Sequence, residues 1–220
     1  MKKGQYCILG FFLLYTVQVN ATGNWNLIKN DSGIKVYTKS ESKTNQIEIK
    51  AISTTQSTLE AFAALMTDVD NFQEWMYAAE ESSLIKKNNN FHFSYYLLSD
   101  MPWPAEDRDV VLDFRILRNT ESNMIYTQSS NIKGMIPEKE NIQRIDAVES
   151  SWQFISMGDN KVKIIFKTRI TPSIRLPGWL ADKVYNLGPY HTIKNMKQYI
   201  QKDKYQKSNM NLNNILTHKN

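Results

Sequence analysis

Arg108 is the residue of this chain whose position most clearly requires a partner. From Arg108 onward the residues alternate, so Arg108, Val110 and Leu112 share the apolar side of a predicted strand. The acidic neighbours Asp107 and Asp109 fall on the opposite side. A guanidinium beside an apolar interior needs a carboxylate, a carbonyl or the polar head of a bound molecule, because leaving it unpaired costs about 3–5 kcal/mol. An internal ion pair and a contact with a bound molecule both meet this need.

The other reactive residues form no catalytic motif. The sequence has no glycine-rich phosphate loop, no Gly-x-Ser-x-Gly motif and no His-Glu-x-x-His motif. Its three histidines, His92, His191 and His218, fall on separate predicted elements. We therefore expect no metal site and no cofactor, and the pattern argues against a hydrolase or a metalloenzyme. The side chains that remain as candidates for acid–base catalysis are Asp107, Asp109, Tyr95 and His191.

The first 21 residues have the features of a cleavable signal peptide. Lys2 and Lys3 precede an apolar run, and Val19-Asn20-Ala21 offers small residues for cleavage. The run is shorter than the roughly 20 residues of a membrane span, which leaves an uncleaved anchor as the lesser alternative. We expect a periplasmic or secreted protein. Cleavage would remove Cys7, the single cysteine, which excludes disulfides and thiol chemistry from the mature chain. It would also lower the formal net charge from +5 to +3, which is too mild to indicate a nucleic-acid partner.

The elements that position Arg108 are predicted by hydrophobic periodicity. Strands are expected over residues 33–39, 46–53, 82–87, 91–98, 124–130, 143–157 and 161–171, in addition to the strand that begins at Arg108. A helix is expected to start at Ser57, and a long C-terminal helix follows Pro177. Gly188-Pro189 interrupts this last helix as either a hinge or a static kink. These elements predict an α+β domain, in which a curved antiparallel sheet of about six to eight strands is closed by the C-terminal helix.

The predicted sheet has a strongly apolar inner face. A single helix over a curved sheet tends to leave an apolar cavity, which is the kind of site that small molecules occupy. Ordinary core packing explains any one of these inner side chains equally well. The inner-face residues are Phe93, Tyr95, Leu112, Phe114, Trp152, Phe154, Ile164 and Phe166. The stripe of the C-terminal helix that would face them contains Leu180, Val184 and Leu187.

Four segments of the chain resemble the START domains, which are lipid-transfer modules. The segment Pro102–Val111, Pro-Trp-Pro-Ala-Glu-Asp-Arg-Asp-Val-Val, resembles the entry to a central strand of that family. The resemblance continues at residues 33–37, 176–180 and 194–200, and covers roughly residues 24–202 in the family's order. It implies a helix-grip fold with a lipid held between the sheet and the C-terminal helix. The same superfamily includes polyketide cyclases, which act on a bound hydrophobic molecule.

These observations predict a non-enzymatic, exported bacterial lipid-binding protein that carries a hydrophobic ligand and possesses no cofactor. Residues 1–21 would be the signal peptide, residues 22–202 the lipid-binding domain and residues 203–220 a disordered polar tail. Arg108 would orient the polar head, while the inner-face residues and Leu180, Val184 and Leu187 would hold the apolar body. The alternatives are a polyketide cyclase-like enzyme and an envelope interaction module without a ligand.

Two features suggest a transient membrane contact. One is the loop of residues 134–140, whose tip carries Met135 and Ile136. The other is a basic row along the strand of residues 161–171, formed by Lys161, Lys163, Lys167 and Arg169, which could meet anionic head groups. A solvated outer sheet face explains the basic row as well.

Overall fold

The computed structural model describes residues 25–41, 46–103, 105–145, 147–170 and 178–217, without the side chains of residues 40, 41, 180 and 182–184. The predicted signal peptide, residues 1–21, lies outside these ranges. The strands are β1 (Asn26–Asp31), β2 (Ile34–Glu41), β3 (Gln46–Gln56), β4 (Ala79–Asn89), β5 (His92–Ser99), β6 (Asp107–Asn119), β7 (Met124–Asn131), β8 (Ile142–Arg144), β9 (Val148–Ser156) and β10 (Lys161–Ile170). The helices are α1 (Leu59–Thr67), η1 (Val69–Glu74), α2 (Gly178–Asp182), η2 (Lys183–Leu187), α3 (Gly188–Tyr199), α4 (Asp203–Gln206) and η3 (Leu212–Asn214).

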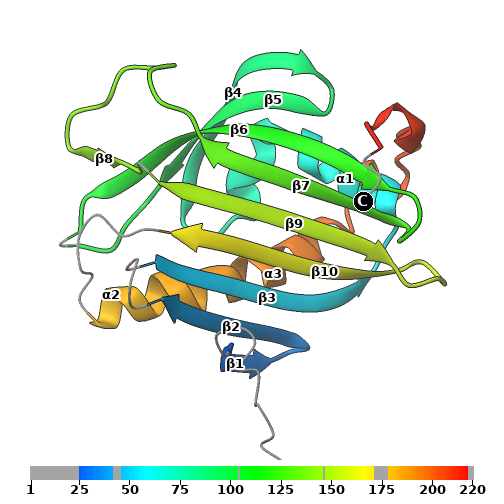
Figure 1. Ribbon diagram of the computed structural model, residues 1–220, viewed down its shortest axis with the longest axis horizontal. Helices are drawn as coiled ribbons and strands as arrows, with labels where there is room; N and C mark the ends of the chain where they lie inside the picture. The colour runs from blue at the N-terminus through cyan, green and yellow to red at the C-terminus, as the bar shows by residue number, and fades with distance from the viewer. Residues whose placement is uncertain (1–24, 42–45, 104, 146, 171–177, 218–220) are drawn as a thin grey trace, which may run out of the picture.

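The strands form one sheet in the order β1-β2-β3-β10-β9-β7-β6-β5-β4 (Figure 1). Neighbours along this path are antiparallel, and the short β8 adds a parallel pairing at the start of β6. The predicted α+β architecture, a curved antiparallel sheet with a C-terminal helix, is confirmed. The described ranges hold ten strands, where six to eight were expected, because β1 and the short β8 join the sheet.

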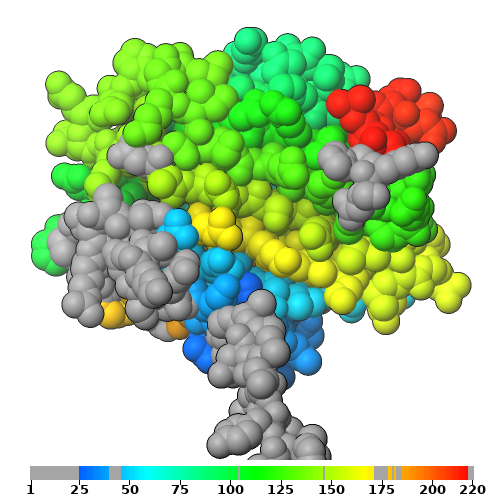
Figure 2. Space-filling view, viewed as in Figure 1, coloured from blue at the N-terminus to red at the C-terminus, as the bar shows by residue number. Residues whose placement is uncertain are grey.

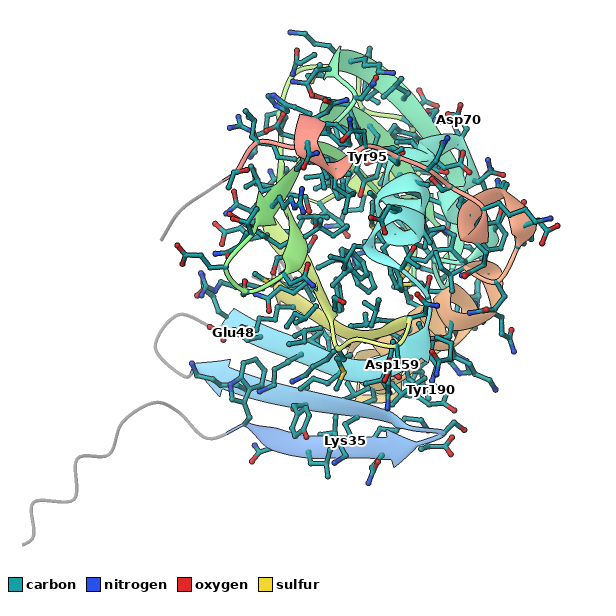
Figure 3. All side chains as sticks on the ribbon, turned by 90° about the vertical axis from the view of Figure 1, so that its right-hand side faces the viewer. Lys35, Glu48, Asp70, Tyr95, Asp159 and Tyr190 are labelled. Carbon is teal, nitrogen blue, oxygen red and sulfur yellow. The ribbon has the colours of Figure 1, made fainter. Side chains whose placement is uncertain are left out.

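The helices cover the inner face of the sheet, and the main core lies between these two layers (Figures 1 and 3). Alternation along the strands explains the layering, because Leu112 and Phe114 of β6 and Ile164 of β10 point inward and are buried. Helix α1 begins at Leu59, two residues later than the predicted start at Ser57. Its N-cap is Thr58, whose hydroxyl accepts a hydrogen bond from the backbone N–H of Ala61 at 3.2 Å.

A second, smaller core lies on the outer face of the sheet, where the sequence led us to expect an exposed loop. Met135 and Ile136 do not form an exposed apolar tip. They pack against the buried residues Tyr96, Leu98 and Val111. The outer sides of β5 and β6 thus carry a small apolar patch, and the loop before β8 covers it. The predicted exposure of this tip is therefore wrong, because both side chains are half buried in packing, and its contact with a membrane stays a prediction.

The prediction of a disordered tail is wrong for residues 203–217. Tyr205, Leu212 and Ile215 are buried in the main core. Thr217 forms a parallel β-bridge with Arg118 at the far end of β6. Figure 2 shows this C-terminal segment, in red, at the upper right, beside the end of the strands. Lysine, asparagine and glutamine dominate the segment, but its few apolar residues are enough to anchor it.

Candidate functional site

Arg108 lies near the start of β6 on the inner side of the sheet, as the alternation predicts. Its neighbours on the same side, Val110 and Leu112, belong to the main core. The Arg108 side chain is half buried, and its Nε is buried without a hydrogen-bond partner among the residues that the structure describes. The guanidinium lies within electrostatic range of the Tyr185 phenol on the C-terminal helix, so it faces the space between sheet and helix.

The acids next to Arg108 are engaged elsewhere. Asp109 is 1% exposed and forms a two-point ion pair with Arg144, with Nε–Oδ1 and Nη2–Oδ2 distances of 2.6 and 3.0 Å. Asp107 accepts a hydrogen bond from the backbone N–H of Met101 at 2.9 Å. The Asp182 side chain is outside the structure's description. A buried donor left without a partner costs about 1–3 kcal/mol, so Arg108 carries an unmet requirement within the described part of the chain.

Most of the predicted ligand-contacting residues form a continuous packed layer deep in the core. Phe93, Tyr95, Leu112, Phe114, Trp152, Phe154 and Ile164 are each at most 6% exposed. Aromatic rings on the helices cover them: Phe62 stacks on Phe154 with centroids 4.2 Å apart, and Phe72 meets Tyr95 edge-on at 5.3 Å. Burial raises the pKa of Tyr95, and Figure 3 shows this residue in the interior, with Glu48 on the outer side of the sheet. Contacts between side chains of this chain fill the layer.

Near Arg108 the inner face is only partly covered. In this region, which we call the mouth, the apolar side chains are half buried although they point inward. The register places them at one end of the sheet, because Ile170 of β10 lies opposite both Ile47 and Val148, and Ser99 lies opposite Arg108. This is the left-hand end in Figure 1, beside α2. The half-buried apolar residues of the mouth are Ile47, Leu97, Ile145, Val148, Phe166, Ile170 and Tyr185.

The C-terminal helix changes character above the mouth. Its central turn, η2, is a π-helix that ends at Gly188-Pro189. Proline lacks an N–H for the usual α-helical bond, and a π turn is one way to accommodate that loss. Leu187 is half buried there, whereas the side chains of Leu180 and Val184 lie outside the described residues. Beyond the break, α3 is firmly held, with Ile193 and Met196 fully buried and the Tyr190 hydroxyl 2.5 Å from Asp31.

A family model described as polyketide cyclase / dehydrase and lipid transport matches residues 64–197, which is more than half of the chain. The chain belongs to this family. An uncharacterised protein of Pseudomonas aeruginosa is 24% identical over 179 residues, covering 81% of this chain and 88% of the relative.

Solved structures agree on the fold. A STAR-related lipid transfer protein from Xanthomonas axonopodis superposes with a TM-score of 0.72 at 23% identity, covering 81% of this chain and 99% of that one. Human STARD10 gives 0.69 at 19% identity and covers 83% of this chain and 74% of its own. The predicted START resemblance is thus confirmed. A START-like fold supports a role in binding a hydrophobic ligand.

Because the superfamily also has enzymatic members, the candidate residues for acid–base catalysis are of interest. The four candidates lie in different parts of the structure. Asp109 is on the outer side with Arg144, Asp107 binds the chain before β6, and Tyr95 is in the packed layer. His191 lies on α3 and stacks on Tyr77 at 5.1 Å, and burial lowers its pKa. Within the described ranges, no group of three His, Cys, Asp or Glu side chains is placed to hold a metal.

Of the apolar mouth residues, only Phe166 was among the predicted ligand-contacting residues, and Tyr185 is the one on the C-terminal helix that the sequence pattern missed. The predicted stripe of Leu180, Val184 and Leu187 follows α-helical spacing, which leaves position 185 off the inner face. A π turn contains one more residue than an α turn, so it shifts the inner face along the chain. Tyr185 consequently packs against the main core. Gly188-Pro189 could have indicated this residue, because a proline there interrupts the helix and changes which residues before it face inward.

The outer face of the sheet carries a polar hollow of about 500 Å³, lined mainly by charged and hydroxyl side chains and by Trp25. Its charges are largely paired across the strands, since Arg169 lies 3.2 Å from Glu48 and 3.4 Å from Glu149. Of the predicted basic row, Arg169 is thereby accounted for as part of an ordinary solvated face. No helix in the described ranges is long and apolar enough to span a bilayer.

Proposed function

We propose that the chain is a non-enzymatic carrier that binds a lipid-like molecule at the mouth, between the sheet and the C-terminal helix. The observation that carries this proposal is the half-covered group of inward apolar side chains around Arg108. Folding normally buries such side chains, so a bound apolar body would complete their burial. Arg108 orients the polar head, and the packed aromatic layer forms the floor against which the apolar body ends.

Entry and exit of the ligand require part of the helical cover to move. Segment 178–187 is the part suited to this, because Trp179 is 45% exposed and residues 185–187 are half buried. Segment 188–199 is held by buried side chains and by the bonds from Tyr190 to Asp31 and from Lys197 to Ser53, the latter 3.2 Å long. The π turn between the two segments is the natural hinge.

A carrier must also meet the membrane that supplies or receives its ligand. Trp103 is 90% exposed and stands in the connection from β5 to β6, the same end of the sheet as the mouth. Trp179 lies on α2, which Figure 1 shows at the same left-hand end of the sheet. Tryptophan prefers the membrane–water interface. We assign transient membrane contact to this pair, in place of the loop of residues 134–140.

The test is to purify the chain from residue 22 onward after export from a bacterial host, measure its mass under native conditions and analyse an organic extract. A lipid at near-unit stoichiometry supports the carrier and names its ligand class. A protein that carries no lipid and also refuses fluorescent fatty-acid and sterol probes refutes the carrier and favours an interaction module. Cell fractionation of the full chain tests the proposed export.

The enzymatic alternative rests on the family description, which includes polyketide cyclases and dehydrases. It is separated from the carrier by incubating the recovered ligand with fresh protein and following its mass. An unchanged ligand supports the carrier, whereas a product formed in excess over the protein would establish catalysis.

A further inference from the structure

The charge at the mouth is unbalanced within the described part of the chain. Arg108 brings a permanent positive charge to the inner side of the sheet. The two carboxylates next to it in sequence are committed to Met101 and Arg144. The half-buried residues of the mouth are apolar, apart from the phenol of Tyr185. The residues directly opposite Arg108 on the neighbouring strands, Ser99 and Gln143, are half buried, polar and uncharged, so they supply no negative charge.

A neutral polar head would leave this imbalance in place. A hydroxyl can accept one hydrogen bond from the guanidinium, but it supplies no negative charge. A carboxylate or phosphate group supplies the charge and can accept two parallel bonds from one guanidinium. Tyr185, which packs against the core from the C-terminal helix within electrostatic range of Arg108, carries a phenol that can donate a second hydrogen bond to the same group.

We propose that the ligand has an anionic head, a carboxylate or a phosphate, held by Arg108 at the mouth, with Tyr185 as an auxiliary donor. This inference rests on the carrier function proposed above and specifies the ligand class. It places the head near the surface and the chain of the lipid toward Phe166 and Trp152, whose rings are 4.4 Å apart. The polar end therefore enters last and leaves first.

The test compares three ligands with the same hexadecyl chain: the fatty acid, the primary alcohol and the monoalkyl phosphate. Each displaces a neutral fluorescent probe from the delipidated chain. We expect the acid, the phosphate or both to bind about tenfold tighter than the alcohol, as a charge-assisted pair allows. The anion that binds more tightly shows whether the head group of the natural ligand is a carboxylate or a phosphate.

The deciding variant is Arg108→Gln, which keeps a polar side chain and removes the charge. It should lower anion affinity about tenfold and leave alcohol affinity within about twofold. Arg115→Gln is the matched control, because Arg115 lies on the same strand but is 54% exposed on the outer side. Arg108→Lys, which keeps the charge, should retain part of the preference and covers the case in which the glutamine variant does not fold.

Three outcomes overturn the inference. Equal affinity for acid, phosphate and alcohol in the wild-type chain rejects the anionic head while leaving the carrier intact. A preference that survives Arg108→Gln assigns the head to another residue. Tighter anion binding in Asp182→Asn would show that Asp182 already neutralises Arg108. If none of the three ligands displaces the probe, the carrier function itself is rejected.

Discussion

Side chains on the inner face of the sheet fall into two groups according to how completely protein atoms cover them. Phe154 is fully buried and stacked between Phe62 and Trp152, whereas Phe166 is half buried at the edge of the mouth. The same residue type on the same face therefore belongs to the core in one place and, in the proposed carrier, to the binding surface in the other. Substitution by alanine separates the two roles.

Phe154→Ala should lower the free energy of unfolding by about 3–5 kcal/mol, because it leaves a cavity in a packed layer. Phe166→Ala should cost about 1–2 kcal/mol, since part of its ring is already exposed. In a lipid-binding titration, Phe166→Ala should weaken affinity several-fold in a chain that remains folded. Chemical denaturation measures the first two effects, and equal destabilisation by both variants would contradict this division.

Arg108 should contribute to ligand binding and not to the stability of the ligand-free fold. Replacing it with methionine removes a buried Nε that lacks a partner among the described residues. We expect Arg108→Met to raise the free energy of unfolding of the delipidated protein by about 1 kcal/mol, a value reduced for partial exposure. Arg115→Met, on the exposed side of the same strand, should change the free energy of unfolding by less than about 0.5 kcal/mol. Chemical denaturation measures both variants. A clear loss of stability in Arg108→Met would indicate an internal partner.

At the residue scale, period-2 alternation was sufficient to predict which way Arg108 and Asp109 point, because side-chain direction in a strand is local. Alternation could not predict that Arg144, from a short strand 35 residues later, would cover and pair with Asp109. Nor could it separate Phe154 from Phe166, since the coverage of each depends on helices distant in sequence.

Asp68 connects the elements at the end of α1 to the C-terminal segment. Its carboxylate lies 2.7 Å from the Tyr205 hydroxyl and 2.8 Å from Lys204 Nζ, and it accepts a bond from Asn71. Burial works to raise the pKa of Asp68, but these three bonds together hold it below its usual value. The charged form of Asp68 therefore adds to the burial of Tyr205 in holding α4 against the core.

Asp68→Ala should cost about 1–2 kcal/mol at neutral pH and speed amide exchange in residues 203–217. The lowered pKa means that this contribution is complete above about pH 4, the value for an unfolded aspartate, and is lost as pH falls through the folded value. The variant and the wild type should thus converge in acid. Asp70→Ala, an exposed neighbour in η1, is the control. Unchanged exchange in Asp68→Ala would contradict this anchoring role.

Elements with strong internal periodicity, such as β6 and β10, were predictable, whereas elements held by tertiary contacts were not. The C-terminal segment looks polar because Tyr205, Leu212 and Ile215 are spaced without a regular period. The loop before β8 looks exposed because its partners, Tyr96 and Val111, lie on other strands. The π turn was foreseeable only as a break at Pro189.

The whole molecule has two unlike ends. The mouth, with Trp103 and Trp179, is at one end, and the β9–β10 turn with the exposed Met157 is at the other. Such an asymmetry predicts one orientation of the carrier on a membrane, with the mouth against the lipid.

Trp103→Ser should lower the partition of the protein onto phosphatidylglycerol-containing vesicles about tenfold, because it removes a large apolar surface from the contact. Met157→Ser removes a 54% exposed apolar side chain from the opposite end and should leave partition unchanged. Vesicle sedimentation measures both, and ligand affinity in detergent-free buffer should be unaltered in each. Equal losses in the two variants would argue against a preferred orientation.

The pairing of β3 with β10 has a consequence for how the chain acquires its structure. Ile49 of β3 meets Thr168 of β10, so the first three strands join the rest of the sheet only when almost the whole domain has been made. Until then the edge of β3 that pairs with β10 has no partner strand. Contacts so distant in sequence slow folding, with typical times of milliseconds to seconds for such topologies. The newly made chain thus remains an incomplete sheet with an open edge until β10 is added, the state in which a chaperone would be most useful to it.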